Sequence, residues 1–230
     1  MTAERNLRPV TAGAGGTIAG ASALSTNRVL RNTYLLLSAT LLFSAAMAGI
    51  AMAVGMPYLG PIVTLVGYFG LLFVTVKLRN SAAGIAAVFA LTGFMGLTLG
   101  PLLSFYLKNV ANGGELVMTS LGITGALFVG LSAYVIRSQR DLSFMRSFIT
   151  VGLVGLLGVI VVGLFVDLSA FQMAISSAII LLMVGCILYE TSAIIHGGQN
   201  NYILATVSLY VSLYNIFLNL LALLGIGGDD

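Results

Sequence analysis

The sequence predicts an all-α, polytopic membrane protein with seven transmembrane helices. Hydrophobic residues make up 59% of the 230 residues and charged residues only 7%, which leaves too little polar surface for a soluble domain. Seven apolar segments are each long enough to cross a bilayer, which takes about 20 residues in a helix. A transmembrane β-barrel would alternate polar and apolar residues along its strands, and these segments do not. Helices therefore satisfy the backbone in lipid.

The apolar segments follow one another with short connections and leave one polar segment at the N-terminus. We expect spans at residues 33–53, 59–77, 82–105, 116–136, 146–166, 168–189 and 203–224. Residues 1–27 are rich in Gly, Ala, Thr and Ser and have no run of large apolar residues of the kind that forms a signal peptide. The sequence therefore predicts a disordered tail over 1–27 and one seven-helix domain over 28–230. Two interpretations of residues 1–27 stay open: an inert terminus or a functional segment.

The charges define a membrane orientation. Nine of the ten cations fall before the first span or on the connections that share its side, namely Arg5, Arg8, Arg28, Arg31, Lys77, Arg79, Arg137, Arg140 and Arg146. The other side carries Lys108 with Glu115, Asp167, Asp229 and Asp230. The positive-inside rule places the N-terminus in the cytoplasm and the C-terminus outside. The net charge of +3 is thus explained by anchors at an anionic leaflet, and no module for nucleic acid accompanies it.

The seventh span carries a polar stripe. Its members are spaced by four, three and four residues, which places them on one helical face: Ser208, Ser212, Asn215 and Asn219. Such a face avoids lipid, so the helix is expected to be central. The stripe either forms hydrogen bonds between helices or lines a narrow water-filled cavity.

Glu190 near the end of the sixth span is the strongest candidate for a functional side chain in the membrane. An ionisable residue within a span costs several kcal/mol and by default indicates function. The alternative is that Glu190, close to the cytoplasmic end, reaches water or a cation such as Arg79. If it turns toward Ser212 instead, it is a candidate proton sensor.

Small residues predict close helix packing. Gly96 and Gly100 form a GxxxG pair, and Gly152, Gly155 and Gly158 recur at every third position of the fifth span. No catalytic motif accompanies them, and the single His196 and single Cys186 cannot form a metal site alone. We therefore expect no enzyme activity, no metal and no cofactor.

Four stretches of the sequence carry a resemblance to a known family. They are "NRVLRNTYLLLSATLLFSA" at the first span, "GFMGLTLGPLLSFYL" at the third, "SAYVIRSQRDLSFM" after the fourth, and residues 188–225, "LYETSAIIHGGQNNYILATVSLYVSLYNIFLNLLALLG". From about residue 25 onward the chain resembles bacterial inner-membrane members of the Bax inhibitor-1 (transmembrane BAX inhibitor motif) family. The resemblance implies a bundle in which the last helix is surrounded by the other six.

The resemblance also implies partners and an activity. Such bacterial proteins are substrates and modulators of FtsH, a membrane-anchored ATP-dependent protease that associates with HflK and HflC. A protease of this kind must grip a flexible cytoplasmic end before it pulls. We therefore expect the handle at the start of the tail, at Met1, Thr2, Ala3, Glu4, Arg5, Asn6, Leu7 and Arg8.

A second activity is implied by other family members, which leak calcium or protons under control of two acidic residues in the sixth and seventh helices. The sixth-helix acid matches Glu190 in "LYE". The seventh-helix acid matches Ser212 in "LYVSLYN", so the pair is broken here. One carboxyl beside a hydroxyl cannot titrate as a coupled acid pair, although a single Glu190 could still control an ion pathway.

Overall fold

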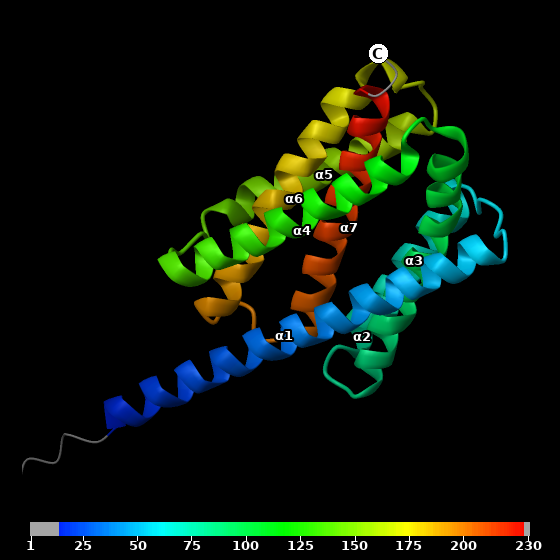
Figure 1. Ribbon diagram of the computed structural model, residues 1–230. Helices are drawn as coiled ribbons and strands as arrows, with labels where there is room; N and C mark the ends of the chain where they lie inside the picture. Colours follow the sequence, from blue (N-terminus) through cyan, green and yellow to red (C-terminus); the bar gives the residue numbers. More distant parts are fainter. Residues whose placement is uncertain (1–13, 228–230) are drawn as a thin grey trace, which may run out of the picture.

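Seven helices make up the transmembrane domain in the computed structural model, which describes the backbone of residues 14–227 and the side chains of residues 27–226 (Figure 1). They are α1 (Ala14–Ala53), α2 (Pro61–Leu78), α3 (Ala83–Asn109), α4 (Gly113–Ser138), α5 (Met145–Gly163), α6 (Gln172–Ile195) and α7 (Tyr202–Gly227), with a short 3₁₀ helix, Ser169–Phe171, before α6. All seven are long and apolar enough to cross a membrane, and the described part contains no strand. The predicted fold class is confirmed.

The observed helices match the predicted spans within a few residues, except that α1 begins at Ala14, well before the predicted residue 33. One further difference affects the site. α6 continues to Ile195, beyond the predicted end at residue 189. The tail predicted for residues 1–27 is not tested. Residues 1–13, which include the expected handle, lie outside the described part, and for residues 14–26 only the helical backbone is described.

The first six helices form two groups of three, and α7 lies between the groups (Figure 1). In the first group α3 packs against α1 and α2, and in the second α6 packs against α4 and α5. In each group a short span lies between two long ones in the sequence. The spans of α1, α2 and α3 have 27, 18 and 27 residues, and those of α4, α5 and α6 have 26, 19 and 27 residues. Because each group contains three spans, the second crosses in the opposite direction to the first.

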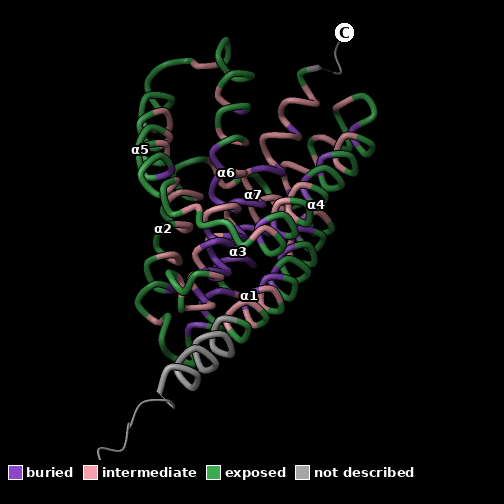
Figure 2. The backbone as a smooth tube through the Cα atoms, turned by 90° about the vertical axis from the view of Figure 1, so that its left-hand side faces the viewer, coloured by how far each residue is buried: buried purple, intermediate pink, exposed green. Residues whose placement is uncertain are grey.

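The seventh helix is central, as predicted. Among its residues 202–226 only Ile226 is exposed, and the buried residues in Figure 2 concentrate around it. Its main neighbours are α1, α3, α4 and α6. The expectation that six helices surround it is therefore too broad, because α2 packs on the outside of α3 and α5 on the outside of α6.

The glycine patterns differ in what they do. A Cβ on Gly96 would collide with the Ser44 carbonyl oxygen, and one on Gly100 would lie 2.5 Å from Ala51 Cβ. The GxxxG pair therefore brings α3 against α1, as predicted. On α5 the prediction holds only for Gly152, where an added Cβ would lie 2.5 Å from Leu182 Cδ1. An added Cβ on Gly155 or Gly158 would meet nothing within 4 Å, and both glycines line an open apolar groove between α5 and α6.

The connections with the basic residues lie at one end of the bundle, which we call the basic end. It comprises the α2–α3, α4–α5 and α6–α7 connections and the start of the first span. The described cations there are Arg28, Arg31, Lys77, Arg79, Arg137, Arg140 and Arg146. Which compartment this end faces stays a prediction.

Candidate functional site

Glu190 lies inside α6, more than one turn before the helix ends. The helix ends at Ile195, and Gly197 follows with a φ of 75°, the left-handed conformation that glycine favours just after a helix C-terminus. The Gln199 N–H then donates to the Ala193 carbonyl at 2.9 Å. Glu190 is only 6% exposed, which favours a buried carboxyl group over one that reaches water. The residues after Glu190 continue α6 to Ile195.

The Glu190 carboxyl group faces the seventh helix. The side chains of Ser208 and Gln199 lie beside it, yet its Oε1 has no hydrogen-bond partner among the described residues. One turn earlier on α6, the buried Cys186 thiol lies beside the Ser212 hydroxyl. Cys186, Glu190, Ser208 and Ser212 therefore form one group, which we call the α6–α7 polar cluster.

The structure brings together only part of the polar stripe on α7. Ser208 and Ser212 belong to the α6–α7 polar cluster, whereas Asn215 lines a separate cavity. The recorded bonds of the stripe run within α7: Ser212 Oγ donates to the Ser208 carbonyl, Asn215 Nδ2 to the Val211 carbonyl, and Asn219 Nδ2 to the Asn215 carbonyl. Between helices, Ser208 lies beside Glu190 and Ser212 lies beside Cys186, both on α6.

Two tyrosines that the sequence analysis did not single out join α7 to α1 and α3. The Tyr210 hydroxyl lies 2.6 Å from Ser44 Oγ on α1 and donates to the Thr92 carbonyl on α3 at 3.3 Å. The Tyr214 hydroxyl donates to the Met95 carbonyl at 3.4 Å. Their signal in the sequence is a phenol within an apolar span, because a buried tyrosine hydroxyl usually needs a partner.

The loops of the basic end are held close to the polar cluster by Ser192 and Asn201. Ser192 Oγ donates to the Arg140 carbonyl and accepts from the Leu142 N–H, both at 3.0 Å. Asn201 Oδ1 accepts from the N–H groups of Ile203 and Leu204, which caps α7. Its Nδ2 donates to the Arg79 carbonyl at 3.0 Å and to Asn80 Oδ1 at 2.9 Å.

His196 belongs to the same network. Its Nδ1 lies 2.9 Å from the Ser192 carbonyl oxygen and its Nε2 lies 3.2 Å from that of Gln139. Ser192 Oγ is 3.4 Å from Nδ1, but this hydroxyl is buried and already committed to the α4–α5 loop. The Ser192–His196 pair therefore ties loops together and offers no free nucleophile.

No group of three or more His, Cys, Asp or Glu side chains that could hold a metal occurs in the described residues. The polar cluster offers one carboxyl, one thiol and two hydroxyls. Such a set can exchange a proton at Glu190 or bind water. The expectation that the protein needs no metal or cofactor stays a prediction.

Comparison with known proteins places this geometry in context. Residues 26–229 match the family model described as "Inhibitor of apoptosis-promoting Bax1". An uncharacterised protein of Pseudomonas aeruginosa is 53% identical over 88% of this chain and 91% of its own length. A protein of Escherichia coli K12 named "Modulator of FtsH protease YccA" is 49% identical over 91% of this chain and 94% of its own length. Its counterpart in Escherichia coli O6:H1, at the same identity, is named "Inner membrane protein YccA".

Proposed function

Because the chain belongs to the Bax inhibitor-1 family, we propose that it modulates an FtsH-type membrane protease, as the name of its Escherichia coli relative states for that protein. The observation that carries the proposal is the 49% identity to that relative over nearly the full length of both chains. The seven apolar helices and the name "Inner membrane protein" of a second relative support a place in the same membrane as the protease.

We propose that the protease engages the N-terminal tail, with the handle at the first eight residues. The family match begins at residue 26, so the tail precedes the family domain. Its Gly/Ala-rich composition offers little apolar surface to bury in a fold. If the basic end faces the cytoplasm, the tail lies on the side from which an ATP-dependent protease with cytoplasmic catalytic domains pulls. HflK and HflC are further proposed partners.

The proposed modulation is competition. α7 is the last helix, and its hydroxyl bonds join it to α1 and α3. Extraction from the N-terminus must therefore break the packing of α1 against α3 and α7 before the chain can leave the membrane. A substrate that is gripped easily and extracted slowly occupies the protease and protects other substrates.

The test is degradation of an unrelated membrane substrate by reconstituted FtsH. Three samples are compared: the full-length protein, a form lacking residues 2–25, and no addition. Slower degradation with the full-length protein alone supports a tail-dependent competitor. Equal slowing by both forms assigns the contact to the bundle and contradicts the tail as the handle. No slowing by either form contradicts the proposed function.

A second candidate function is an ion pathway controlled by Glu190. It is favoured by one observation, the buried Glu190 Oε1 without a hydrogen-bond partner in the described part of the chain. Because Ser212 stands where leaking family members carry an acid, we expect a weak proton or calcium flux. Liposome flux should fall with Glu190→Gln and rise with Ser212→Asp, which restores two carboxyls. If the unchanged protein, Glu190→Gln and Ser212→Asp all give the same flux as empty liposomes, this candidate function is contradicted.

A further inference from the structure

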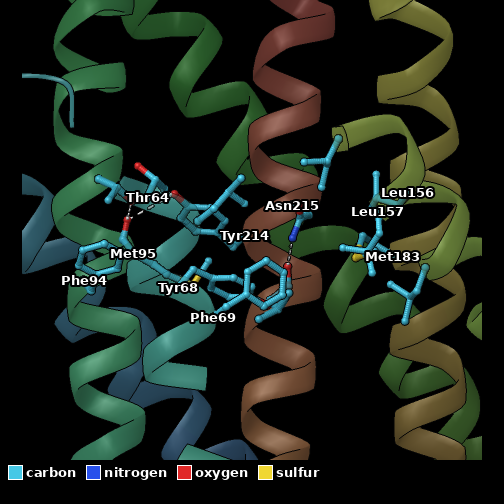
Figure 3. Close-up of a pocket in the computed structure, with 15 residues that line it drawn as sticks. Thr64, Tyr68, Phe69, Phe94, Met95, Leu156, Leu157, Met183, Tyr214 and Asn215 are labelled. Carbon is cyan, nitrogen blue, oxygen red and sulfur yellow. Dashed lines mark hydrogen bonds between the residues drawn. The ribbon is translucent and has the colours of Figure 1, made fainter. Parts of the chain in front are cut away.

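A cavity of about 360 Å³ lies between the two peripheral helices, beside the middle of α7 (Figure 3). It is lined by residues of α2, α3, α5, α6 and α7. At its mouth, Phe69 of α2 is 45% exposed and Leu157 of α5 is 48% exposed. These side chains face lipid in a membrane, so the cavity opens sideways into the hydrocarbon. It is separate from the α6–α7 polar cluster, with which it shares no lining residue.

The two walls of the cavity differ in chemistry. In Figure 3, Tyr68, Phe69 and Phe94 lie on one side and the aliphatic side chains of α5 and α6 on the other, with Asn215 between them. Aromatic side chains favour contact with a flat ring, in an offset-stacked or edge-to-face arrangement. No charged residue lines the cavity, and a charged ligand at this depth would carry a cost of several kcal/mol. The lining therefore suits a neutral ring.

Two polar side chains that line the cavity, those of Asn215 and Tyr68, can orient a ligand. Asn215 Nδ2 is bonded within α7, which leaves Oδ1 as an acceptor for which the described residues provide no recorded partner. The Tyr68 hydroxyl likewise has no recorded partner in residues 27–226. One acceptor and one hydroxyl within an apolar cavity orient a ligand that carries hydroxyl or carbonyl groups at one end. A phospholipid cannot supply such an end here, because its headgroup stays at the interface.

We propose that this cavity binds the ring of an isoprenoid quinone or quinol dissolved in the membrane. A quinol hydroxyl donates to Asn215 Oδ1, and the Tyr68 hydroxyl donates to an oxygen of the ring. The ring stacks against the aromatic wall, and the isoprenoid chain leaves into lipid between α2 and α5. The volume of about 360 Å³ lies near the lower end of the range for ligand pockets, about 300–1,000 Å³, which fits a ring head and not a whole lipid.

A second cavity provides a matched control. It measures about 430 Å³, opens between α1 and α4 on the other side of α7, and shares Tyr214 with the first. Its other hydroxyls already have partners within the protein: Ser44 pairs with Tyr210 at 2.6 Å, and Thr124 donates to the Ser120 carbonyl at 2.7 Å. It offers no comparable free polar end, so we expect it to hold acyl chains only.

The test uses fluorescence, because the chain has no tryptophan and quinones quench indole emission. One reporter, Phe69→Trp, lies at the mouth of the first cavity. The other, Leu121→Trp, lines the second cavity at a native exposure of 50%, against 45% for Phe69. Each full-length variant is placed in phospholipid nanodiscs and titrated with decylubiquinone and with its reduced form.

We expect saturable quenching of the Phe69→Trp reporter by the quinone and only linear, collisional quenching of the Leu121→Trp reporter. Adding Tyr68→Phe, which removes one hydroxyl and keeps the ring, should weaken saturable binding about fivefold, the effect of one hydrogen bond. Asn215→Leu should weaken binding of the quinol more than binding of the quinone, because only the quinol donates to Oδ1.

Three results would overturn the proposal. The first is linear quenching of equal slope at both reporters. The second is saturable binding that Tyr68→Phe leaves unchanged, since this variant alters a single atom and should fold normally. The third is strong quenching of the Phe69→Trp reporter by phospholipids with brominated acyl chains that persists when the quinone is added. This result would assign the cavity to lipid.

Discussion

The Tyr210 hydroxyl on α7 lies 2.6 Å from the Ser44 hydroxyl on α1, and both residues are buried in the middle of the bundle. The same hydroxyl donates to the Thr92 carbonyl on α3. One phenol therefore joins the last helix to two helices of the first group. This contact links α1 to α7, which matters for a protein proposed to resist extraction from its N-terminus.

Replacing Tyr210 with Phe should destabilise the bundle. The substitution keeps the ring but removes the hydrogen-bond partner of Ser44 Oγ. We therefore expect the free energy of unfolding to fall by about 1 kcal/mol. Unfolding in detergent with increasing SDS would measure it. A double-mutant cycle with Ser44→Ala should show coupling, whereas Tyr58→Phe, at 68% exposure, should change nothing. Strict additivity of the two buried substitutions would contradict a bond between them.

Gly96→Ala should destabilise the contact between α1 and α3. The added Cβ would meet the Ser44 carbonyl oxygen, which belongs to the backbone and cannot rotate away. We expect about 1–3 kcal/mol of lost stability from overpacking, measured by the same unfolding assay. Gly155→Ala is the matched control, because nothing lies within 4 Å of the new methyl group. Equal effects of the two substitutions would show that the loss comes from the glycine and not from the contact.

The number, order and central member of the helices could be predicted because lipid leaves few choices. Each span must satisfy its backbone internally, so length and hydropathy alone identify it. The stripe of Ser and Asn on α7 also predicts a central helix, since polar side chains avoid lipid. Glu190 could be chosen as a candidate for the same reason.

The partners of those side chains could not be predicted, because periodicity places a residue on a face without saying what covers it. Asn215 and Ser212 share a face of α7, yet Ser212 meets α6 and Asn215 faces a cavity beside α2 and α5. The burial of Glu190 depends on where α6 ends, and span boundaries are the least certain part of a sequence prediction. Gly155 and Gly158 match a packing motif, but α5 is peripheral and has no partner there.

Asn201 should contribute through two separable effects at the basic end. Asn201→Asp keeps the oxygen that caps α7 and loses the donor to the α2–α3 loop, whereas Asn201→Ala loses both. We expect Asn201→Ala to lower the free energy of unfolding by about 1 kcal/mol more than Asn201→Asp does. Limited proteolysis near residues 79–82 should accelerate with both variants, because both release that loop. Protection of the loop in either variant would contradict the role of Nδ2.

The stability of the α4–α5 loop should depend on pH through the carboxyl group of Asp141. Its Oδ1 accepts from the Ser143 N–H at 2.9 Å, and hydrogen bonds from Ser143 hold the pKa of this exposed carboxyl below its ordinary value of 3.8. A lowered folded pKa means that the stabilisation is present above the unfolded pKa and is lost as the pH falls through the folded one. Carboxyl NMR of labelled aspartate should show the transition below pH 3.8, and Asp141→Asn should abolish it.

Glu190 should reduce the stability of the bundle. A buried carboxyl with an unpaired oxygen is less favourable than an apolar side chain of similar volume, so Glu190→Met should raise the unfolding temperature in detergent. Thr191→Val is the control next to it: the Thr191 hydroxyl is also buried without a recorded partner, but it is never charged, so a smaller gain is expected.

A gain with Glu190→Met would mean that this carboxyl is not part of what holds α6 against α7, and a residue that costs stability is a candidate for function. The variant then separates the two functions proposed above. Modulation of FtsH through the tail should survive Glu190→Met, whereas any ion flux should disappear. A fall in the unfolding temperature would contradict the prediction and show that Ser208 and Gln199, which lie beside the carboxyl group, satisfy it well enough to make it structural.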